Sequence, residues 1–236
     1  MKNFTLITIF ISTFIILFFS NIEQKKYSNP LNDFEKSIFK ILLVESEITN
    51  MPITNGTGFV IDYKDGKSLI LTNSHVCDFN DEYMSINYNI FLQNYEQLTS
   101  ASGRLVKVVK KDLKKDLCAL VYDGYLEPIK LKDESELKQT DELYVIGAPR
   151  GNFPVISKVI FARKNFNQIQ KMMAFPEMSD TDIFVVSGYI LPGNSGSPVL
   201  NKRGEAVGIV FASDENTSSL VVPTSEILKF IENITF

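Results

Sequence analysis

Short apolar runs separated by turn-forming residues constrain the fold of this chain more than any other feature of its sequence. Each run is rich in Ile, Leu, Val or Phe and is shorter than a typical helix, which indicates strands. Asp65-Gly66, between two of the runs, is typical of a tight hairpin turn. The runs are Ser37–Val44, Gly58–Asp62, Ser68–Thr72, Met84–Leu92, Arg104–Val109, Leu117–Tyr122, Leu143–Ile146, Val155–Phe161, Ile183–Val186, Pro198–Leu200, Ala206–Phe211 and Leu220–Val222. Their regular spacing predicts an all-β sandwich or barrel.

The C-terminal segment has a different periodicity. Ile227, Leu228, Ile231 and Ile234 recur at helical spacing after Pro223. The sequence therefore predicts a helix over about residues 224–234, with these side chains along one face.

The first 27 residues are distinct in composition. Phe4–Phe19 is almost entirely apolar and is followed by the polar residues Glu23–Lys26. A helix over this run would be about 24 Å long, which is short of a bilayer core of about 30 Å. We therefore expect residues 1–27 to be a signal peptide or a signal anchor that contacts the membrane, with a buried helix of a soluble domain as the alternative. The remainder, 28–236, would then be exported: periplasmic, secreted, or membrane-anchored outside the cytoplasm.

Composition narrows the class of protein. The 236 residues are 44% hydrophobic with a net charge of −4, as in an ordinary globular protein. The lysines are scattered and the charge balance is acidic, which argues against a nucleic-acid partner.

Three polar residues lie where strands begin or end. Ser195 lies in the glycine-rich sequence Leu191–Pro198, which could equally be a simple turn between strands. His75 is the only histidine and follows an apolar run, and a lone histidine is more often structural. Asp116 leads directly into the next strand, whereas its competitor Asp112 does not. Together, in the order His, Asp, Ser on an all-β pattern, they indicate nucleophilic catalysis.

The chemistry explains why these residue types belong together. A serine hydroxyl is a weak nucleophile, so a base must accept its proton as it attacks. His75 is the one side chain of this chain with an ordinary titration range suited to that role near neutral pH. An aspartate on the other imidazole nitrogen, here Asp116, fixes the tautomer and stabilises the imidazolium.

From about Ser37 to Phe236 the chain resembles the trypsin-like serine proteases of the chymotrypsin fold, in particular the bacterial branch of HtrA-type proteases and glutamyl endopeptidases. The matching segments are Gly56–Ile61, Leu71–Val76, Asp116–Leu120, Val145–Gly151, Gly193–Pro198 and Gly204–Val210. The resemblance implies two packed six-stranded antiparallel β-barrels, at about 33–124 and 137–222, with the C-terminal helix outside and a cleft between. Because the sequence ends soon after that helix, we expect no PDZ domain of the kind that often follows in HtrA-type proteases.

The same resemblance implies an activity. It predicts a serine endopeptidase that cleaves protein or peptide substrates through His75, Asp116 and Ser195 and an acyl-enzyme intermediate, with no metal and no cofactor. The alternative is a catalytically latent homologue that binds peptides or a partner protein in the same cleft. Oligomeric state is left open by the sequence.

By the same resemblance, the backbone N–H groups of Gly193 and Ser195 form the oxyanion hole. Asn194 stands where digestive relatives have an aspartate that pairs with a newly formed N-terminus. Because its amide is neutral, we expect no activation by N-terminal trimming.

The resemblance also locates a substrate pocket. It places Tyr189 at the base of the first specificity pocket, with Ile190, Val210 and Phe211 in the walls. No acid is available there to bind Arg or Lys, so we expect a small or medium apolar residue before the scissile bond.

The two cysteines are ambiguous. Cys77 and Cys118 each lie two residues after a candidate catalytic residue, so they could form a disulfide in an exported protein. Both also lie in apolar runs, where a free cysteine behaves as a small hydrophobe. A zinc site that combines them with His75 would lack a fourth ligand.

Overall fold

The computed structural model describes residues 34, 36–45, 52–77, 88–93, 103–164, 174–188, 190–213 and 217–236. The expected signal segment, residues 1–27, lies outside this part of the chain. In the described ranges, no helix combines the length and apolarity needed to cross a bilayer.

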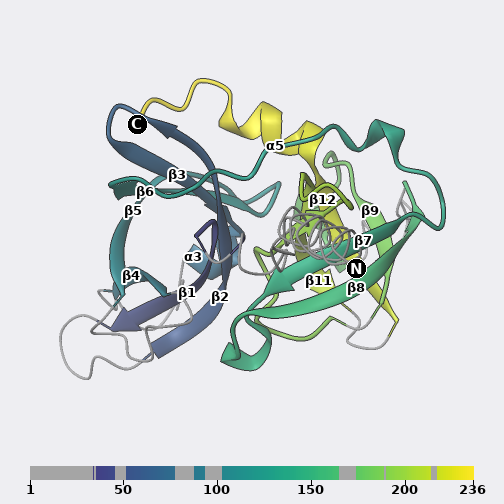
Figure 1. Cartoon of the computed structure of the whole chain (residues 1–236), viewed down its shortest axis with the longest axis horizontal. Coiled ribbons are helices and arrows are strands. Elements are labelled where there is room, and N and C mark those ends of the chain that lie inside the picture. The colour runs from purple at the N-terminus through teal and green to yellow at the C-terminus, as the bar shows by residue number, and fades with distance from the viewer. Residues whose placement is uncertain are drawn as a thin grey trace, which may run out of the picture. The chain divides into compact units, whose positions relative to one another are not determined.

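Two closed antiparallel barrels of six strands each make up the fold, which confirms the predicted all-β class (Figure 1). The first barrel has the order β1-β2-β3-β6-β5-β4 and the second β10-β11-β12-β9-β8-β7. The strands of the first barrel are β1 (Ile38–Glu45), β2 (Pro52–Lys64), β3 (Lys67–Thr72), β4 (Tyr88–Gln93), β5 (Arg104–Asp112) and β6 (Leu117–Asp123). Those of the second are β7 (Glu142–Gly147), β8 (Val155–Arg163), β9 (Phe184–Ser187), β10 (Pro198–Leu200), β11 (Ala206–Ser213) and β12 (Ser218–Pro223). Short helical turns are α3 (Ser74–Cys77), η2 (Glu134–Glu136), η3 (Pro149–Gly151) and η4 (Pro176–Met178).

Most predicted strands agree with the observed ones to within a few residues, but β2 does not. It begins at Pro52 rather than Gly58, because Thr54 and Asn55 pair with Leu43 and Leu42 of β1. Backbone pairing with a neighbour extends this strand through residues that carry no apolar signal.

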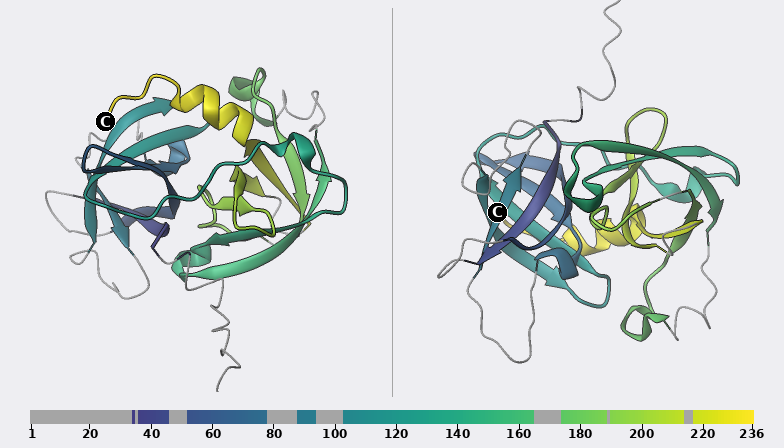
Figure 2. Two further views of the ribbon diagram at one scale, coloured as in Figure 1. Left: turned by 45° about the horizontal axis from the view of Figure 1, so that its top comes forward. Right: turned by 90° about the horizontal axis from the view of Figure 1, so that it is seen from below.

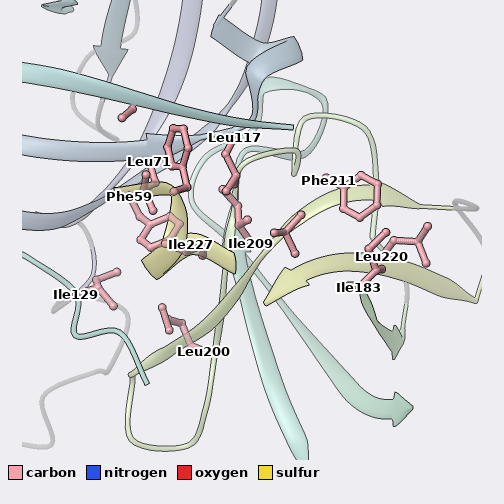
Figure 3. Close-up of a cluster of buried hydrophobic side chains, with 14 of the residues drawn as sticks. Phe59, Leu71, Leu117, Ile129, Ile183, Leu200, Ile209, Phe211, Leu220 and Ile227 are labelled. Carbon is pink, nitrogen blue, oxygen red and sulfur yellow. The ribbon is translucent and has the colours of Figure 1, made fainter. Parts of the chain in front are cut away.

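Apolar packing joins the two barrels. Each barrel has its own core, and a third cluster includes Phe59, Leu71 and Leu117 of the first barrel with Leu200 and Ile209 of the second (Figure 3). Burying each large apolar side chain contributes about 1.5–3 kcal/mol. The loops that meet at this junction are therefore carried on a common packed core.

The C-terminal helix α5 (Thr224–Ile231) lies along the junction of the barrels in Figure 2, in contact with β6 of the first and with β11 and β12 of the second. Ile227 is fully buried as expected, but Leu228 is 49% exposed, so its predicted place on the buried face is wrong. Phe230 fills that face instead. The helix also ends at Ile231 rather than near residue 234, because Glu232 leaves the helical region (ψ 129°) and Asn233 is left-handed (φ +66°).

Candidate active site

His75 and Asp116 form a hydrogen-bonded pair at the edge of the first barrel. His75 lies on α3, directly after β3, and Asp116 ends the turn that precedes the neighbouring strand β6. The Nδ1 atom of His75 is 2.8 Å from Oδ2 of Asp116. Because a carboxylate accepts hydrogen bonds, this contact favours the tautomer of the neutral imidazole that carries its proton on Nδ1.

The second carboxylate oxygen of Asp116 is also held in place. Oδ1 accepts hydrogen bonds from the Ser74 hydroxyl at 2.8 Å and from the His75 backbone N–H at 3.1 Å. The Asn73 amide donates to the Asp116 backbone carbonyl at 2.9 Å. The carboxylate is mostly buried (13% exposed) while the imidazole is half exposed (49%). The Asp116 carboxylate is therefore fixed in place, whereas the His75 imidazole faces outward.

A disulfide joins Cys77 and Cys118, with 6.6 Å between their Cα atoms. It ties α3 to β6 two residues beyond His75 and two residues beyond Asp116. The sequence left this pairing open. Both sulfurs are committed to the bond, so the zinc alternative is wrong. Elsewhere in the described part of the chain, no cluster of His, Cys, Asp or Glu is suited to a metal ion.

Ser195 lies on the loop between β9 and β10, which begins and ends on the second barrel. The Arg150 N–H donates to the Pro192 carbonyl at 2.7 Å, and the Gly196 N–H donates to the Val210 carbonyl at 2.9 Å. Gly193 (φ +96°) and Gly196 (φ +84°) allow the backbone to turn at those points. The loop is therefore anchored on both sides of the serine.

The N–H groups of Gly193 and Ser195 have no acceptor among the described residues. The peptide between Pro192 and Gly193 is trans, so its N–H points away from the carbonyl that Arg150 holds. Backbone N–H groups are normally paired, so two donors beside a serine without an acceptor among the described residues are unusual.

Thr57 of β2 connects this loop to the first barrel, a role that the sequence analysis missed. Its hydroxyl donates to the Gly193 carbonyl at 2.9 Å and accepts from the Ala148 N–H at 3.0 Å. Its own N–H donates to the Ser195 carbonyl at 2.8 Å. The only sequence signal was the pair of glycines that flank it. A Cβ at Gly56 would lie 2.6 Å from a methyl group of Val76.

Asn194 is buried and satisfied within its own loop. Its amide donates to the Leu191 carbonyl at 3.1 Å, and its amide oxygen accepts from the Ser197 hydroxyl at 3.4 Å. Gly147 packs directly against this loop, since a Cβ there would be 2.0 Å from the Ser197 hydroxyl. The loop thus needs no charged partner for residue 194.

Two of the three candidate catalytic residues are in contact in the structure, and the third is not hydrogen-bonded to them. His75 and Asp116 are joined by a hydrogen bond, whereas the Ser195 hydroxyl has no hydrogen-bond partner within the described ranges. The two segments nevertheless approach each other at Gly56, since its Cβ position is 2.6 Å from Val76, next to His75, and 3.0 Å from the Ser195 carbonyl.

A cavity of about 480 Å³ opens beside the His75–Asp116 pair. Phe175 and Phe211 form one wall, with their rings 5.3 Å apart and nearly perpendicular. The rest of the lining consists of Ser74, Leu113, Glu177 and Met178. The cavity is thus about half apolar and half polar, and Glu177 adds a second carboxylate to that of Asp116.

The predicted pocket residues have different positions. Phe211 lines this cavity, but Ile190 and Val210 are buried in the core of the second barrel. Tyr189 lies outside the described residues.

Comparisons with known proteins agree with the two-barrel fold. The sequence profile of the family described as trypsin-like peptidase domain matches residues 56–209. The HtrA-like serine protease of Staphylococcus haemolyticus is 27% identical over 222 residues, which is 81% of this chain and 32% of that protein. A protein named as a DegP-like periplasmic serine endoprotease from Pseudomonas putida is 32% identical over 155 residues, 65% of this chain and 28% of its own length. The chain thus spans about a third of the length of these curated relatives.

Solved structures show the same fold. The HtrA-type protease AlgW, as a variant with a tripeptide, superposes with a TM-score of 0.68 at 18% identity, over 89% of this chain and 63% of that one. The active form of the Rv3671c protease from M. tuberculosis gives 0.64 at 20% identity, over 90% of this chain and 87% of that one.

Proposed function

Because the chain belongs to the trypsin-like peptidase family, we propose that it is a serine endopeptidase in which Ser195 is the nucleophile, His75 the general base and Asp116 its orienting partner. The observation that carries the proposal is the 2.8 Å hydrogen bond between His75 Nδ1 and Asp116 Oδ2. In the neutral imidazole that bond keeps the proton on Nδ1, so the lone pair that a general base requires lies on Nε2 of a ring that lines the cavity.

In the first step, Ser195 Oγ attacks the substrate carbonyl carbon and gives its proton to His75 Nε2. The imidazolium that forms is stabilised by the Asp116 carboxylate. The same proton then passes to the leaving amine, the C–N bond breaks, and an ester to Ser195 remains.

In the second step, a water molecule attacks that ester. His75 again accepts a proton, this time from the water, and returns it to Ser195 Oγ as the carboxylic acid product leaves. Both steps pass through a tetrahedral intermediate with a negatively charged oxygen.

The N–H groups of Gly193 and Ser195 serve as donors to that oxygen. Their lack of partners among the described residues supports this role. The Arg150–Pro192 hydrogen bond orients the peptide of the Gly193 N–H, and the Ser197–Asn194 hydrogen bond orients the peptide of the Ser195 N–H, so neither donor need reorganise during the reaction.

The substrate would bind as an extended chain along β11. On the β10 side of β11, strand pairing stops at Ile209, whereas on the other side it continues to Ser213. Among the described residues, no strand pairs with this side of β11 at Phe211 and Ala212, so we expect a peptide backbone to pair there. Its side chains would enter the cavity beside Phe175 and Phe211, and we retain the expectation of a small or medium apolar residue before the scissile bond.

Export of the chain is part of the proposal. A buried disulfide between Cys77 and Cys118 is typical of proteins that fold in an oxidising compartment. The Pseudomonas relative is named as periplasmic.

A latent, peptide-binding homologue is the second candidate, and one observation favours it. The Ser195 hydroxyl is not hydrogen-bonded to His75 or to any other described residue. An unliganded catalytic serine can have this geometry and tighten only with substrate, so the two candidates make different predictions in solution.

The test is covalent labelling of the full chain with a fluorophosphonate probe, compared with Ser195→Ala and with heat-unfolded protein. Endopeptidase function predicts labelling that requires both the fold and Ser195, followed by cleavage of members of a peptide library. Folded wild-type protein that takes up no probe would refute the proposal and support the latent homologue.

A further inference from the structure

The turn between β5 and β6, residues 113–116, delivers Asp116 to His75. Asp116 has a left-handed backbone (φ +50°), which a non-glycine residue adopts only when its surroundings hold it there. At the start of the turn, Asp112 Oδ1 accepts hydrogen bonds from the N–H groups of Lys114 (3.0 Å) and Lys115 (3.1 Å). These bonds fix the beginning of the turn but not the end that bears Asp116.

The other end of the turn is held from α5. Glu226 of α5 is buried, with its side chain 2% exposed, and one of its carboxylate oxygens is bonded to Lys115 Nζ. Its other oxygen accepts from Lys229 Nζ at 2.7 Å. Burial raises the pKa of Glu226, but the hydrogen bonds from Lys115 and Lys229 outweigh it and hold that pKa below its ordinary value. Glu226 is therefore a buried anion that depends on its two lysines, because water does not reach it to replace them.

Further contacts join the same part of the first barrel to the C-terminal half of the chain. The Thr181 hydroxyl donates to the Lys114 carbonyl at 2.9 Å. Lys110 Nζ donates to the Phe230 carbonyl at 2.6 Å. Lys115, next to Asp116, is thus one of several residues of the first barrel that are bonded to the C-terminal half of the chain.

We propose that Glu226 is a positioning residue for the catalytic pair: through Lys115 it holds the turn so that Asp116 Oδ2 meets His75 Nδ1. This inference rests on the proposed endopeptidase function, since it assigns α5 a part in that activity. Of the two lysines bound to Glu226, only Lys115 lies on the turn, because Lys229 belongs to α5 itself.

The two lysines provide a matched pair of variants. Lys115→Met and Lys229→Met each remove one cation from the buried Glu226, so both lower the stability of the fold. Only Lys115→Met frees the turn. It is expected to reduce kcat about 10- to 100-fold with KM changed less than twofold, since small displacements of catalytic groups have effects of this size. Lys229→Met leaves kcat within twofold, and Lys115→Arg, which can still reach Glu226, restores most of it.

A second readout does not require activity. His75 is the only histidine, so the proton between its Nδ1 and Asp116 gives a single low-field resonance in the proton NMR spectrum. Lys115→Met is expected to shift or broaden this resonance, and Lys229→Met to leave it in place. A purely structural ion pair would alter the melting temperature of both variants and the resonance of neither.

The outcomes separate this inference from the function on which it rests. Equal losses of kcat in both lysine variants, or an unchanged resonance in Lys115→Met, would overturn the positioning role. If the wild type proves inactive but its resonance still responds to Lys115→Met alone, the positioning role holds and the endopeptidase function fails.

Discussion

Gly193 is the position where a single methyl group should do most damage to the proposed oxyanion site. A Cβ there would lie 2.4 Å from the Ala148 carbonyl oxygen and 2.9 Å from the Arg150 nitrogen. Both are backbone atoms, so no side-chain rotation relieves the contact, and the loop must move by about 1 Å to restore an ordinary contact distance. That movement breaks the Arg150–Pro192 hydrogen bond, which orients the Gly193 N–H. We predict that Gly193→Ala lowers kcat by about 10²–10³, the usual cost of losing one oxyanion donor.

Gly66→Ala is the matched control. Gly66 also has a left-handed backbone (φ +82°), but nothing lies within 4 Å of its Cβ position. Both variants incur the conformational cost of about 1–2 kcal/mol, which should lower Tm by roughly 2–8 °C in a domain of this size. Only Gly193→Ala should lose turnover.

The assay combines kcat and KM on a cleaved peptide with the rate of fluorophosphonate labelling and thermal unfolding. Slow labelling of a folded Gly193→Ala protein is the expected result. Full turnover in Gly193→Ala, or an equal loss in Gly66→Ala, would show that the loop does not present the Gly193 N–H to the substrate.

Three other variants test separate features. Cys77→Ala/Cys118→Ala opens a loop of 41 residues, and the chain-entropy relation predicts that the free energy of unfolding falls by about 4 kcal/mol. Urea unfolding with an unchanged midpoint would contradict this prediction. The pKa of Glu205 is lowered to about 2 by hydrogen bonds, of which the largest is from Asn201. Because the folded-state pKa is depressed, the contribution of Glu205 to folding stability is complete above pH 4.5 and is lost as the pH falls toward 2. Glu205→Gln should therefore flatten the fall of Tm over that pH range. Thr57→Val leaves the Gly193 carbonyl and the Ala148 N–H unpaired, at about 1–3 kcal/mol each. Both kcat and stability should fall in Thr57→Val, whereas Thr57→Ser should retain both. Normal kcat in Thr57→Val would show that this hydroxyl does not support the loop.

The fold class was predictable because its signals are local. Short apolar runs and turn residues such as Asp65-Gly66 indicated an all-β protein, whereas the two six-stranded barrels were predicted from the family resemblance. His75 and Asp116 were identified as candidates from their positions at strand ends, and the family resemblance then matched their two segments to the histidine and aspartate segments of the family. Cys77 and Cys118 were left open, since spacing along the chain does not fix the direction in which two sulfurs point.

Other parts of the site depend on residues far apart in sequence. Thr57 meets Gly193 across 136 positions, and Glu226 meets Lys115 across 111. Nothing in the local sequence of a threonine between glycines, or of a glutamate on an amphipathic helix, reveals such a partner. The same reason explains the error at Leu228, because helical period alone does not say which side of the helix the barrels will cover.

The hydrogen bonds of Thr57 also determine when the proposed activity can arise. During synthesis the first barrel, with its histidine and aspartate, is complete before the serine loop has been made. That loop in turn is held by a threonine that it does not carry. A chain with one folded barrel therefore has no working set of groups, and the capacity to cut other proteins arises only in the last docking event.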